Sequence, residues 1–286
     1  MARIDLSGLE IAYELLGPEN GPAAVITPGG RFPYDTPGVP QLGEKLAEAG
    51  WRVLLWDRPN CGGSDISFDG PSESGMQADA LVALIRALDL GPIAVLGGSA
   101  GSRVSLIAAA RAPELVSKLG LWWISGGAIS LAQLGSYYTG ESAMAAAAHD
   151  MEAVADLPGW AEQMRRNPRN RDIVLRQERG PFIARMQQWA AAFAYSERSP
   201  VPGMEPEDFR RLTMPALIFR SGESDLSHTR RTSEWVAELL PDASLAEPPW
   251  GDQEWNQQQA GHIERGDDLF GRWPLLAPQL LEFLQD

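Results

Sequence analysis

Short, mostly apolar runs alternate with helix-forming segments in the first part of the chain. The runs AAVIT (23–27), RVLLW (52–56) and IAVLG (93–97) have the length of strands. Residues 40–50 read as a helix, and residues 81–88 place apolar side chains at the i, i+3, i+4 and i+7 positions of another. Strands that alternate with helices form parallel sheets with both faces buried. The sequence therefore predicts an α/β fold, with a mostly parallel sheet and helices on both faces.

This rhythm stops at about residue 126 and resumes at residue 213. Residues 126–210 contain helical patches broken by Gly and Pro, without a clear strand. A chain of 286 residues fits one α/β domain that carries an insertion. We therefore expect an α/β core of residues 1–125 and 211–286, interrupted by a helical cap at residues 126–210.

Ser99 lies in the sequence Gly97-Gly98-Ser99-Ala100-Gly101, after an apolar run and before a helix-forming segment. The pattern G-x-S-x-G is short, but a strand before it and a helix after it are the context in which it forms a sharp turn. Such a turn presents the hydroxyl at the carboxyl edge of the sheet. The free N–H groups of the helix N-terminus there can bind a developing oxyanion. We therefore predict that Ser99 is a nucleophile.

Composition and charge limit the possible partners. The formal net charge is −14, and the only basic concentration, residues 165–176, reads as a solvated helix face. This charge disfavours nucleic acid and anionic membranes, so we expect a small-molecule substrate. No signal peptide is apparent, and the single Cys61 excludes an internal disulfide, so we expect a cytoplasmic protein. Monomer and homo-oligomer both stay open.

Four segments resemble the α/β-hydrolase fold family, and the resemblance extends over nearly the whole chain. They are TPGGRF (27–32), WDRPNCGGSD (56–65), GGSAGS (97–102) and FRSGESD (219–225). In their amino-acid sequence these segments resemble most the esterase and proline-iminopeptidase-like branches of the family. Two positions depart from the family pattern: Pro28 replaces a histidine of the first loop, and Pro59 replaces a glycine of the second.

The resemblance implies a mostly parallel sheet of about eight strands and a serine hydrolase that uses no metal or cofactor. By position, the backbone N–H groups of Gly30 and Ala100 would form the oxyanion hole. Asp225 would be the acid of the catalytic triad. A cap of this kind would roof the active site, and we expect at least one of Trp160, Trp189 and Tyr195 to line it.

The histidine of such a triad is the least certain member. His149 lies in the expected cap, outside the family's chain order of serine, acid and histidine. His262 follows that order, but it lies about ten residues further along the chain than the family pattern places its histidine. At the position where the family has the histidine, this chain has Asp252. We favour His262 as the base, with one ring nitrogen facing Ser99. His228 is the alternative base or a substrate contact, and the absence of a working base is a third possibility.

The expected reaction is hydrolysis of an ester, lactone or related acyl bond of a small, largely apolar substrate. Hydrolysis of a carbon–carbon bond or of a prolyl peptide are alternatives within the same fold. A catalytically impaired small-molecule-binding module is the alternative outside enzymes.

Overall fold

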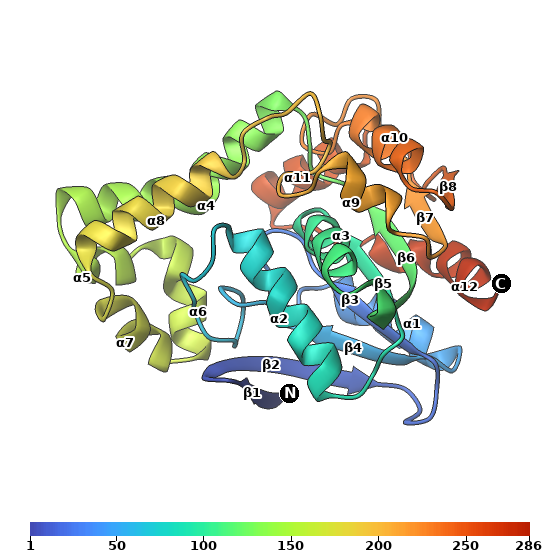
Figure 1. Ribbon diagram of the computed structural model, residues 1–286, viewed down its shortest axis with the longest axis horizontal. Coiled ribbons are helices and arrows are strands. Elements are labelled where there is room, and N and C mark those ends of the chain that lie inside the picture. Colours follow the sequence, from blue (N-terminus) through green and yellow to red (C-terminus); the bar gives the residue numbers. More distant parts are fainter.

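The computed structural model describes residues 1–286 and contains a single eight-stranded sheet (Figure 1). The strands are β1 (Ala2–Leu6), β2 (Leu9–Leu16), β3 (Ala23–Thr27), β4 (Arg52–Trp56), β5 (Ile93–Gly98), β6 (Val116–Trp122), β7 (Ala216–Phe219) and β8 (Ala243–Ala246). Their order across the sheet is β1-β2-β4-β3-β5-β6-β7-β8. Strands β3 to β8 are parallel, and β1 and β2 form an antiparallel hairpin at one edge. The predicted fold class is confirmed.

Helices cover both faces of this sheet. They are α1 (Val39–Glu48), α2 (Glu73–Ala87), α3 (Ala100–Arg111), α10 (Arg230–Leu239), α11 (Glu254–Arg265) and α12 (Ala277–Gln285), with short 3-10 turns η1 (Pro113–Leu115) and η3 (Trp273–Leu276). Figure 1 shows α2 and α3 on one face, with α1 and α12 on the other. No helix combines the length and the apolar character that crossing a bilayer requires.

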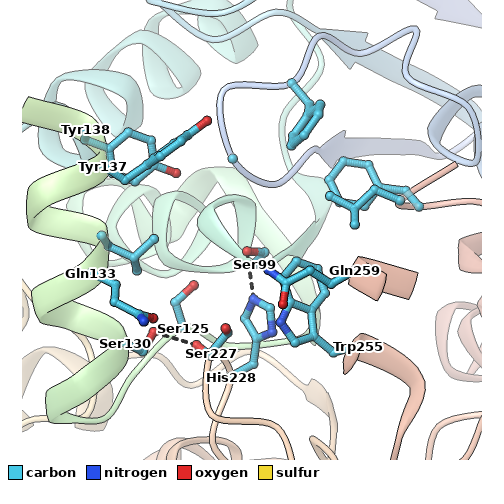
Figure 2. A pocket seen from close by; sticks show the side chains of 15 residues that line it. Ser99, Ser125, Ser130, Gln133, Tyr137, Tyr138, Ser227, His228, Trp255 and Gln259 are labelled. Atoms are coloured by element: carbon cyan, nitrogen blue, oxygen red, sulfur yellow. Dashed lines mark hydrogen bonds between the residues drawn. The ribbon is translucent and has the colours of Figure 1, made fainter. Parts of the chain in front are cut away.

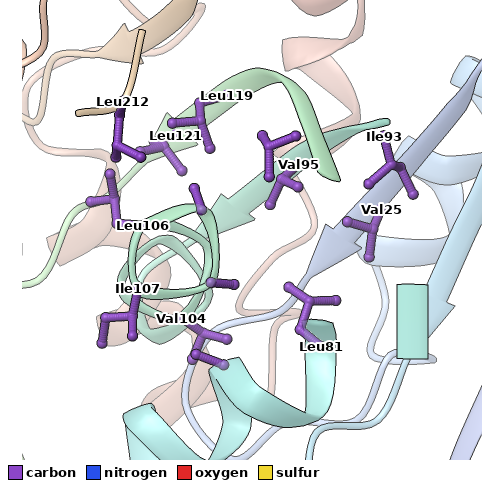
Figure 3. Packing of buried hydrophobic residues seen from close by; sticks show 14 of the residues in the cluster. Val25, Leu81, Ile93, Val95, Val104, Leu106, Ile107, Leu119, Leu121 and Leu212 are labelled. Carbon is purple, nitrogen blue, oxygen red and sulfur yellow. The ribbon is translucent and has the colours of Figure 1, made fainter. Parts of the chain in front are cut away.

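The central strands are buried on both faces, and their side chains divide between two cores. On β3, Val25 packs in the core under α2 and α3, whereas Ala24 and Ile26 pack in the core under α1 and α12. On β5, Val95 faces the α2 and α3 side (Figure 3), and its neighbour Leu96 faces the other. Successive side chains of each strand therefore enter opposite cores. Burial on both faces explains why these strands contain few polar residues.

The chain between β6 and β7 is helical. Its elements are α4 (Ala128–Ala148), α5 (Met151–Ala155), η2 (Pro158–Trp160), α6 (Ala161–Arg166), α7 (Arg169–Leu175), α8 (Arg179–Ala191) and α9 (Pro206–Arg210). Helices α4 to α8 lie together at one end of the molecule, at the left in Figure 1. Trp160, Phe182 and Trp189 pack in a separate apolar cluster there. The division into a core and a cap domain at residues 126–210 stays a prediction.

The turn between β5 and α3 requires glycine at two positions, because a side chain at either one would overlap the backbone. A Cβ on Gly101 would lie 2.0 Å from the carbonyl oxygen of Thr27, and a Cβ on Gly97 would lie 2.6 Å from that of Gly101. Both contacts are with backbone atoms, which have little freedom to move. Glycine at these positions therefore lets the first turn of α3 approach the end of β3.

We predict that Gly101→Ala is strongly destabilising, because the new methyl group overlaps the backbone of β3. The expected loss in the free energy of unfolding is about 3 kcal/mol or more. The matched control is Gly251→Ala, where no atom lies within 4 Å of the added Cβ and the backbone φ is not positive. Its free energy of unfolding should change by less than about 0.5 kcal/mol. Urea unfolding of both variants measures the difference, and equal stabilities would contradict the close approach.

Candidate active site

Ser99 lies at the sharp turn between β5 and α3, in a backbone conformation that few residues adopt. Its φ is 56° and its ψ is −121°, and its N–H donates to the carbonyl of Trp122 at 3.2 Å. A non-glycine residue with positive φ is strained and persists only where the surroundings hold it. The turn places the Ser99 hydroxyl above the N-terminus of α3 and into a cavity (Figure 2).

His228 meets Ser99 in this cavity. Its Nε2 lies 2.9 Å from Ser99 Oγ, and its Nδ1 lies 3.0 Å from Asp225 Oδ2. Figure 2 shows the contact between the serine and the imidazole. Asp225 and His228 are both almost fully buried, with 3 % and 2 % of their surface exposed. The structure therefore brings together a serine hydroxyl, an imidazole and a carboxylate in hydrogen-bond sequence, an arrangement that can activate a serine.

The Asp225 carboxylate also fixes the loop that carries His228. Its Oδ1 accepts hydrogen bonds from the backbone N–H groups of Ser227 and His228, each at 2.8 Å. Its Oδ2 faces the imidazole of the same loop. One carboxylate thus sets both the backbone turn and the orientation of the ring. Thr229 then caps α10, so the loop is anchored at both ends.

The prediction that His262 lies beside Ser99 is wrong. The structure places His262 on α11, exposed to solvent, with Nδ1 2.8 Å from the carbonyl oxygen of Asp267. It does not line the cavity that contains Ser99. His228, the alternative named from the sequence, takes the position next to Ser99 instead.

The physical reason lies in the segment after β8. The sequence around His262 resembles the Gly-His loop of the family, but residues 254–265 form helix α11 and carry that side chain away from Ser99. Asp252, in the loop before this helix, contacts the segment before Asp225. Its Oδ1 accepts from the N–H of Glu223 at 3.3 Å, and its carbonyl accepts from Ser224 Oγ at 3.1 Å. Asp252 therefore supports the loop that carries Asp225, and the segment after β8 places no histidine beside Ser99.

Two tryptophans enclose the imidazole of His228. Trp123 is stacked on it, with ring centroids 5.7 Å apart and an interplanar angle of 15°. Trp255 of α11 meets it edge to face at 4.6 Å. No local pattern in the sequence predicts a function for Trp255, because its contact with His228 depends on where α11 lies in the folded chain. These contacts restrict the rotation of the ring and shield its faces from water.

The backbone next to Ser99 is arranged to receive an oxyanion. Gly30 lines the cavity with φ of 49°, and a Cβ on Gly29 would lie 2.9 Å from the Cβ of Ser99. The N–H groups of Gly30 and Ala100 donate to no other backbone group. Ala100 is the first residue of α3, where the helix dipole adds partial positive charge. The two predicted donors therefore have N–H groups available beside the serine.

Buried polar groups of the second loop hold the Gly30 segment in place. Arg58 Nη2 donates to the carbonyl oxygens of Gly29 at 3.0 Å and of Gly30 at 2.7 Å. The Asp57 carboxylate accepts from the N–H groups of Tyr34 and Gly63, both at 2.7 Å. Burial raises the pKa of Asp57 to about 6. These bonds fix the loop through its carbonyl oxygens and leave the Gly30 N–H without a backbone partner.

The cavity over Ser99 has a volume of about 290 Å³. Its lining residues are Gly30, Phe32, Ser99, Ser125, Ser130, Gln133, Leu134, Tyr137, Tyr138, Ser227, His228, Trp255, Gln259, Leu269 and Phe270. Helix α4 forms one wall and α11 contributes to another (Figure 2). The volume suits a small ligand.

The aromatic residues that line this cavity differ from those expected. None of Trp160, Trp189 and Tyr195 is among them. Trp160 and Trp189 are buried in the separate cluster of the helical segment, and α4 supplies Tyr137 and Tyr138 in their place. The long helix α4 directly follows β6, so it is the part of the insertion nearest to the sheet edge.

No group of three or more His, Cys, Asp or Glu side chains is arranged to hold a metal ion. Burial raises the pKa of the Cys61 thiol to about 12, which keeps this lone cysteine protonated and unreactive.

Comparison with curated proteins gives a short match. A 2-hydroxy-6-oxononadienedioate/2-hydroxy-6-oxononatrienedioate hydrolase of Escherichia coli strain K12 is 38 % identical over 88 residues. The match covers 31 % of this chain and 31 % of that protein, so it spans about a third of either length.

Solved structures match over almost the full length. A hydrolase from Pseudomonas aeruginosa PA01 has a TM-score of 0.63 at 19 % identity, covering 100 % of this chain and 98 % of that one. An enol-lactonase from Burkholderia xenovorans LB400 has a TM-score of 0.58 at 20 % identity, covering 100 % of both chains. A 2-hydroxy-6-oxo-6-phenylhexa-2,4-dienoate hydrolase from Rhodococcus sp. strain RHA1 has a TM-score of 0.61 at 19 % identity, covering 99 % and 98 %. At these identities the likeness concerns the fold.

A family model described as the alpha/beta hydrolase fold matches residues 32–197, which is more than half of the chain. The matched region contains the turn at Ser99 and runs through most of the helical insertion. Together with the eight-stranded sheet and the full-length structural matches, it shows that this chain belongs to the α/β hydrolase fold family.

Proposed function

We propose that this protein is a serine hydrolase in which Ser99 is the nucleophile, His228 the general base and Asp225 the orienting acid. The observation that carries the proposal is the unbroken hydrogen-bond sequence from Ser99 Oγ through the imidazole to the Asp225 carboxylate. A serine hydroxyl is a poor nucleophile at its ordinary pKa, and this arrangement is the one that activates it.

In the first half of the reaction, Ser99 Oγ attacks the substrate carbonyl while His228 Nε2 takes its proton. The Asp225 carboxylate stabilises the imidazolium that forms. The Gly30 and Ala100 N–H groups receive the negative charge on the former carbonyl oxygen. The tetrahedral intermediate collapses as the imidazolium gives its proton to the leaving group, and an acyl-enzyme remains on Ser99.

In the second half, a water molecule replaces the leaving group next to His228. The imidazole takes a proton from this water as its oxygen attacks the acyl carbonyl. Collapse of the second tetrahedral intermediate returns the proton to Ser99 Oγ and releases the acid product. The ring of Trp123, stacked on the imidazole, and that of Trp255, edge to face with it, keep both nitrogens in position through both halves.

We propose small esters or lactones as substrates, as the sequence resemblance implied. Apolar side chains of Phe32, Leu134, Leu269 and Phe270 line part of the cavity, and its volume of about 290 Å³ suits a small substrate. The enol-lactonase among the structural matches lends support to a lactone. The dienoate and dienedioate hydrolases among the matches keep carbon–carbon hydrolysis as the second candidate.

A small-molecule-binding module without catalysis is disfavoured by the position of His228. A protein that only binds ligands has no need for an imidazole that joins a buried carboxylate to a strained serine. A fluorophosphonate probe separates the two functions, because it reacts with serines that a neighbouring base activates. We expect one labelled site, at Ser99.

We predict that Ser99→Ala lowers kcat by about 10³-fold or more, because the acyl-enzyme cannot form. Hydrolysis of 4-nitrophenyl acetate and fluorophosphonate labelling measure the loss. Ser117→Ala, an exposed serine at the start of β6, is the matched control and should keep the activity of the unmodified protein. Turnover by Ser99→Ala close to that of the control would refute the serine mechanism.

We predict opposite results for the two histidines that follow Asp225 in the chain. His228→Ala should lower kcat by about 10³-fold or more, because Ser99 loses its base. His262→Ala should leave kcat within about twofold, since His262 is exposed and contacts only Asp267. Circular dichroism shows whether each variant is folded. A loss of activity in His262→Ala alone would restore the assignment made from the sequence.

We predict that Asp225→Asn and Asp225→Ala separate the two functions of this carboxylate. Asn keeps an oxygen for the Ser227 and His228 N–H groups but turns an amide N–H toward His228 Nδ1. It should therefore lower kcat by roughly 10³- to 10⁴-fold while the free energy of unfolding changes by less than about 1 kcal/mol. Ala also leaves two buried N–H groups without a partner, which costs about 2–4 kcal/mol of stability. Steady-state kinetics and urea unfolding measure the two effects, and equal stabilities would contradict the dual function.

A further inference from the structure

We propose that the cavity over Ser99 selects an uncharged substrate and holds a neutral hydrogen-bonding group of it against Ser125 and Gln133. The inference rests on the proposed hydrolase function and specifies its substrate class. Hydroxyl and amide groups, which both donate and accept hydrogen bonds, have the required chemistry, whereas carboxylates do not.

The lining of the cavity contains no carboxylate, ammonium or guanidinium group that could pair with a charged substrate. Among the fifteen lining residues there is no Asp, Glu, Lys or Arg. Burial raises the pKa of Tyr138 to about 12 and also raises the pKa of Tyr137, so both phenols stay neutral. A carboxylate inside this cavity would lose water without gaining a cationic partner, and that loss opposes binding.

No arginine is among the residues that line the cavity. Arg31, next to Gly30 in the chain, forms two hydrogen bonds with the Glu73 carboxylate, at 3.1 and 3.2 Å. Its guanidinium also lies 4.2 Å from the centre of the Trp160 ring. Arg58 holds the carbonyls of the Gly30 loop. Neither side chain lines the cavity, so neither is available as a counter-ion for a substrate carboxylate.

Polar side chains form one wall of the cavity, which we call the polar wall, beside Ser99 and His228. Figure 2 shows Ser125, Ser130, Gln133 and Ser227 gathered on one side of Ser99 and His228. Ser130 Oγ is engaged, because it donates to the Ser227 carbonyl at 2.7 Å. Ser125 Oγ is different: the residue is 1 % exposed, it lines the cavity, and its hydroxyl has no partner in the chain. A buried hydroxyl without a partner costs free energy that a bound group can recover.

Gln133 completes this wall from helix α4. Its side chain is exposed and lines the cavity, so its amide offers both a donor and an acceptor to a ligand. The Ser125 hydroxyl also donates and accepts. Such a pair recognises neutral groups that do both, which is why we assign it to a hydroxyl or amide.

This assignment distinguishes the chain from the relative found by sequence comparison. The name of that relative describes a dioate, a compound with two carboxylates. The match to it covers only 31 % of this chain, and the lining of the present cavity offers no cation for either carboxylate. We therefore expect the present enzyme to reject dicarboxylate substrates.

The test uses three 4-nitrophenyl esters of hexanedioic acid that differ only at the distal end. One ends in a primary amide, one in a methyl ester and one in a carboxylate. We expect kcat/KM to be highest for the amide and about 100-fold lower for the carboxylate. A second pair carries a methyl ester or a carboxylate on the alcohol part, so that both sides of the scissile bond are examined. Equal kcat/KM values for neutral and anionic partners in both sets would overturn the proposal.

Measurements at high salt distinguish substrate discrimination that arises in the cavity from discrimination caused by the electrostatic field of the whole protein. The net charge of −14 repels anions at long range, and 0.5 M NaCl screens this repulsion. Discrimination that arises in the cavity should persist at that concentration. Discrimination that falls below about threefold there would assign the effect to the net charge and overturn the proposal.

Variants of the polar wall provide the decisive comparison. Gln133→Arg should raise kcat/KM for the carboxylate ester by at least about tenfold and lower it for the amide, because it supplies the missing cation. Gln257→Arg adds the same charge at an exposed position on α11 and should change neither value. Ser125→Ala should lower kcat/KM for the amide by about fivefold relative to 4-nitrophenyl hexanoate, which lacks a distal polar group.

The outcomes also separate this inference from the proposed function. Ser99-dependent hydrolysis of 4-nitrophenyl hexanoate with no preference among the distal groups would overturn only the substrate class. An absence of Ser99-dependent hydrolysis with every ester, together with no fluorophosphonate labelling, would overturn the hydrolase function itself.

Discussion

The site depends on the carboxylate of Asp225. It receives two backbone N–H groups of its own loop and one ring nitrogen of His228, and it is buried with them. A spacing of three residues makes this possible, because a carboxylate can fold back onto the N–H groups two and three positions later. The imidazole of His228 and the carboxylate of Asp225 are therefore held by a single short turn. The strained Ser99, which follows β5 at the same edge of the sheet, then needs only to meet a ring whose position is already set.

Most of the fold could be predicted from the sequence, because its strands and helices carry their own periodicity. The buried runs at β3, β4 and β5 and the glycines around Ser99 are local signals, and the structure agrees with them. Helix α11 was missed because the resemblance to the family suggested a loop there, and its sequence offers few apolar residues to indicate a helix. Local patterns thus specify elements well when those elements pack against a core.

The site was only partly predictable for a related reason. Ser99 could be named because its surroundings are contiguous in the chain. The choice between His228 and His262 depends on which loop reaches the serine, and that is set by the packing of α11 and the loop around Asp252. The cavity wall is a similar case: Tyr137 and Tyr138 line it because α4 lies over the sheet edge. Composition alone did not distinguish them from the buried Trp160.

The topology of the sheet explains how His228 can replace a histidine that the family pattern places after the last strand. Strands β5, β6, β7 and β8 are neighbours in that order and run parallel, so their carboxyl ends meet at one edge. The loop after β7 begins one strand nearer to the serine on β5 than the loop after β8 does, a difference of about 4.8 Å. A base on the β7 loop has a shorter distance to cover, and the chain after β8 is free to form α11. That helix brings Trp255 against the imidazole. The chain after β8 therefore still contributes to the candidate site, as a packing surface for the imidazole that the β7 loop supplies.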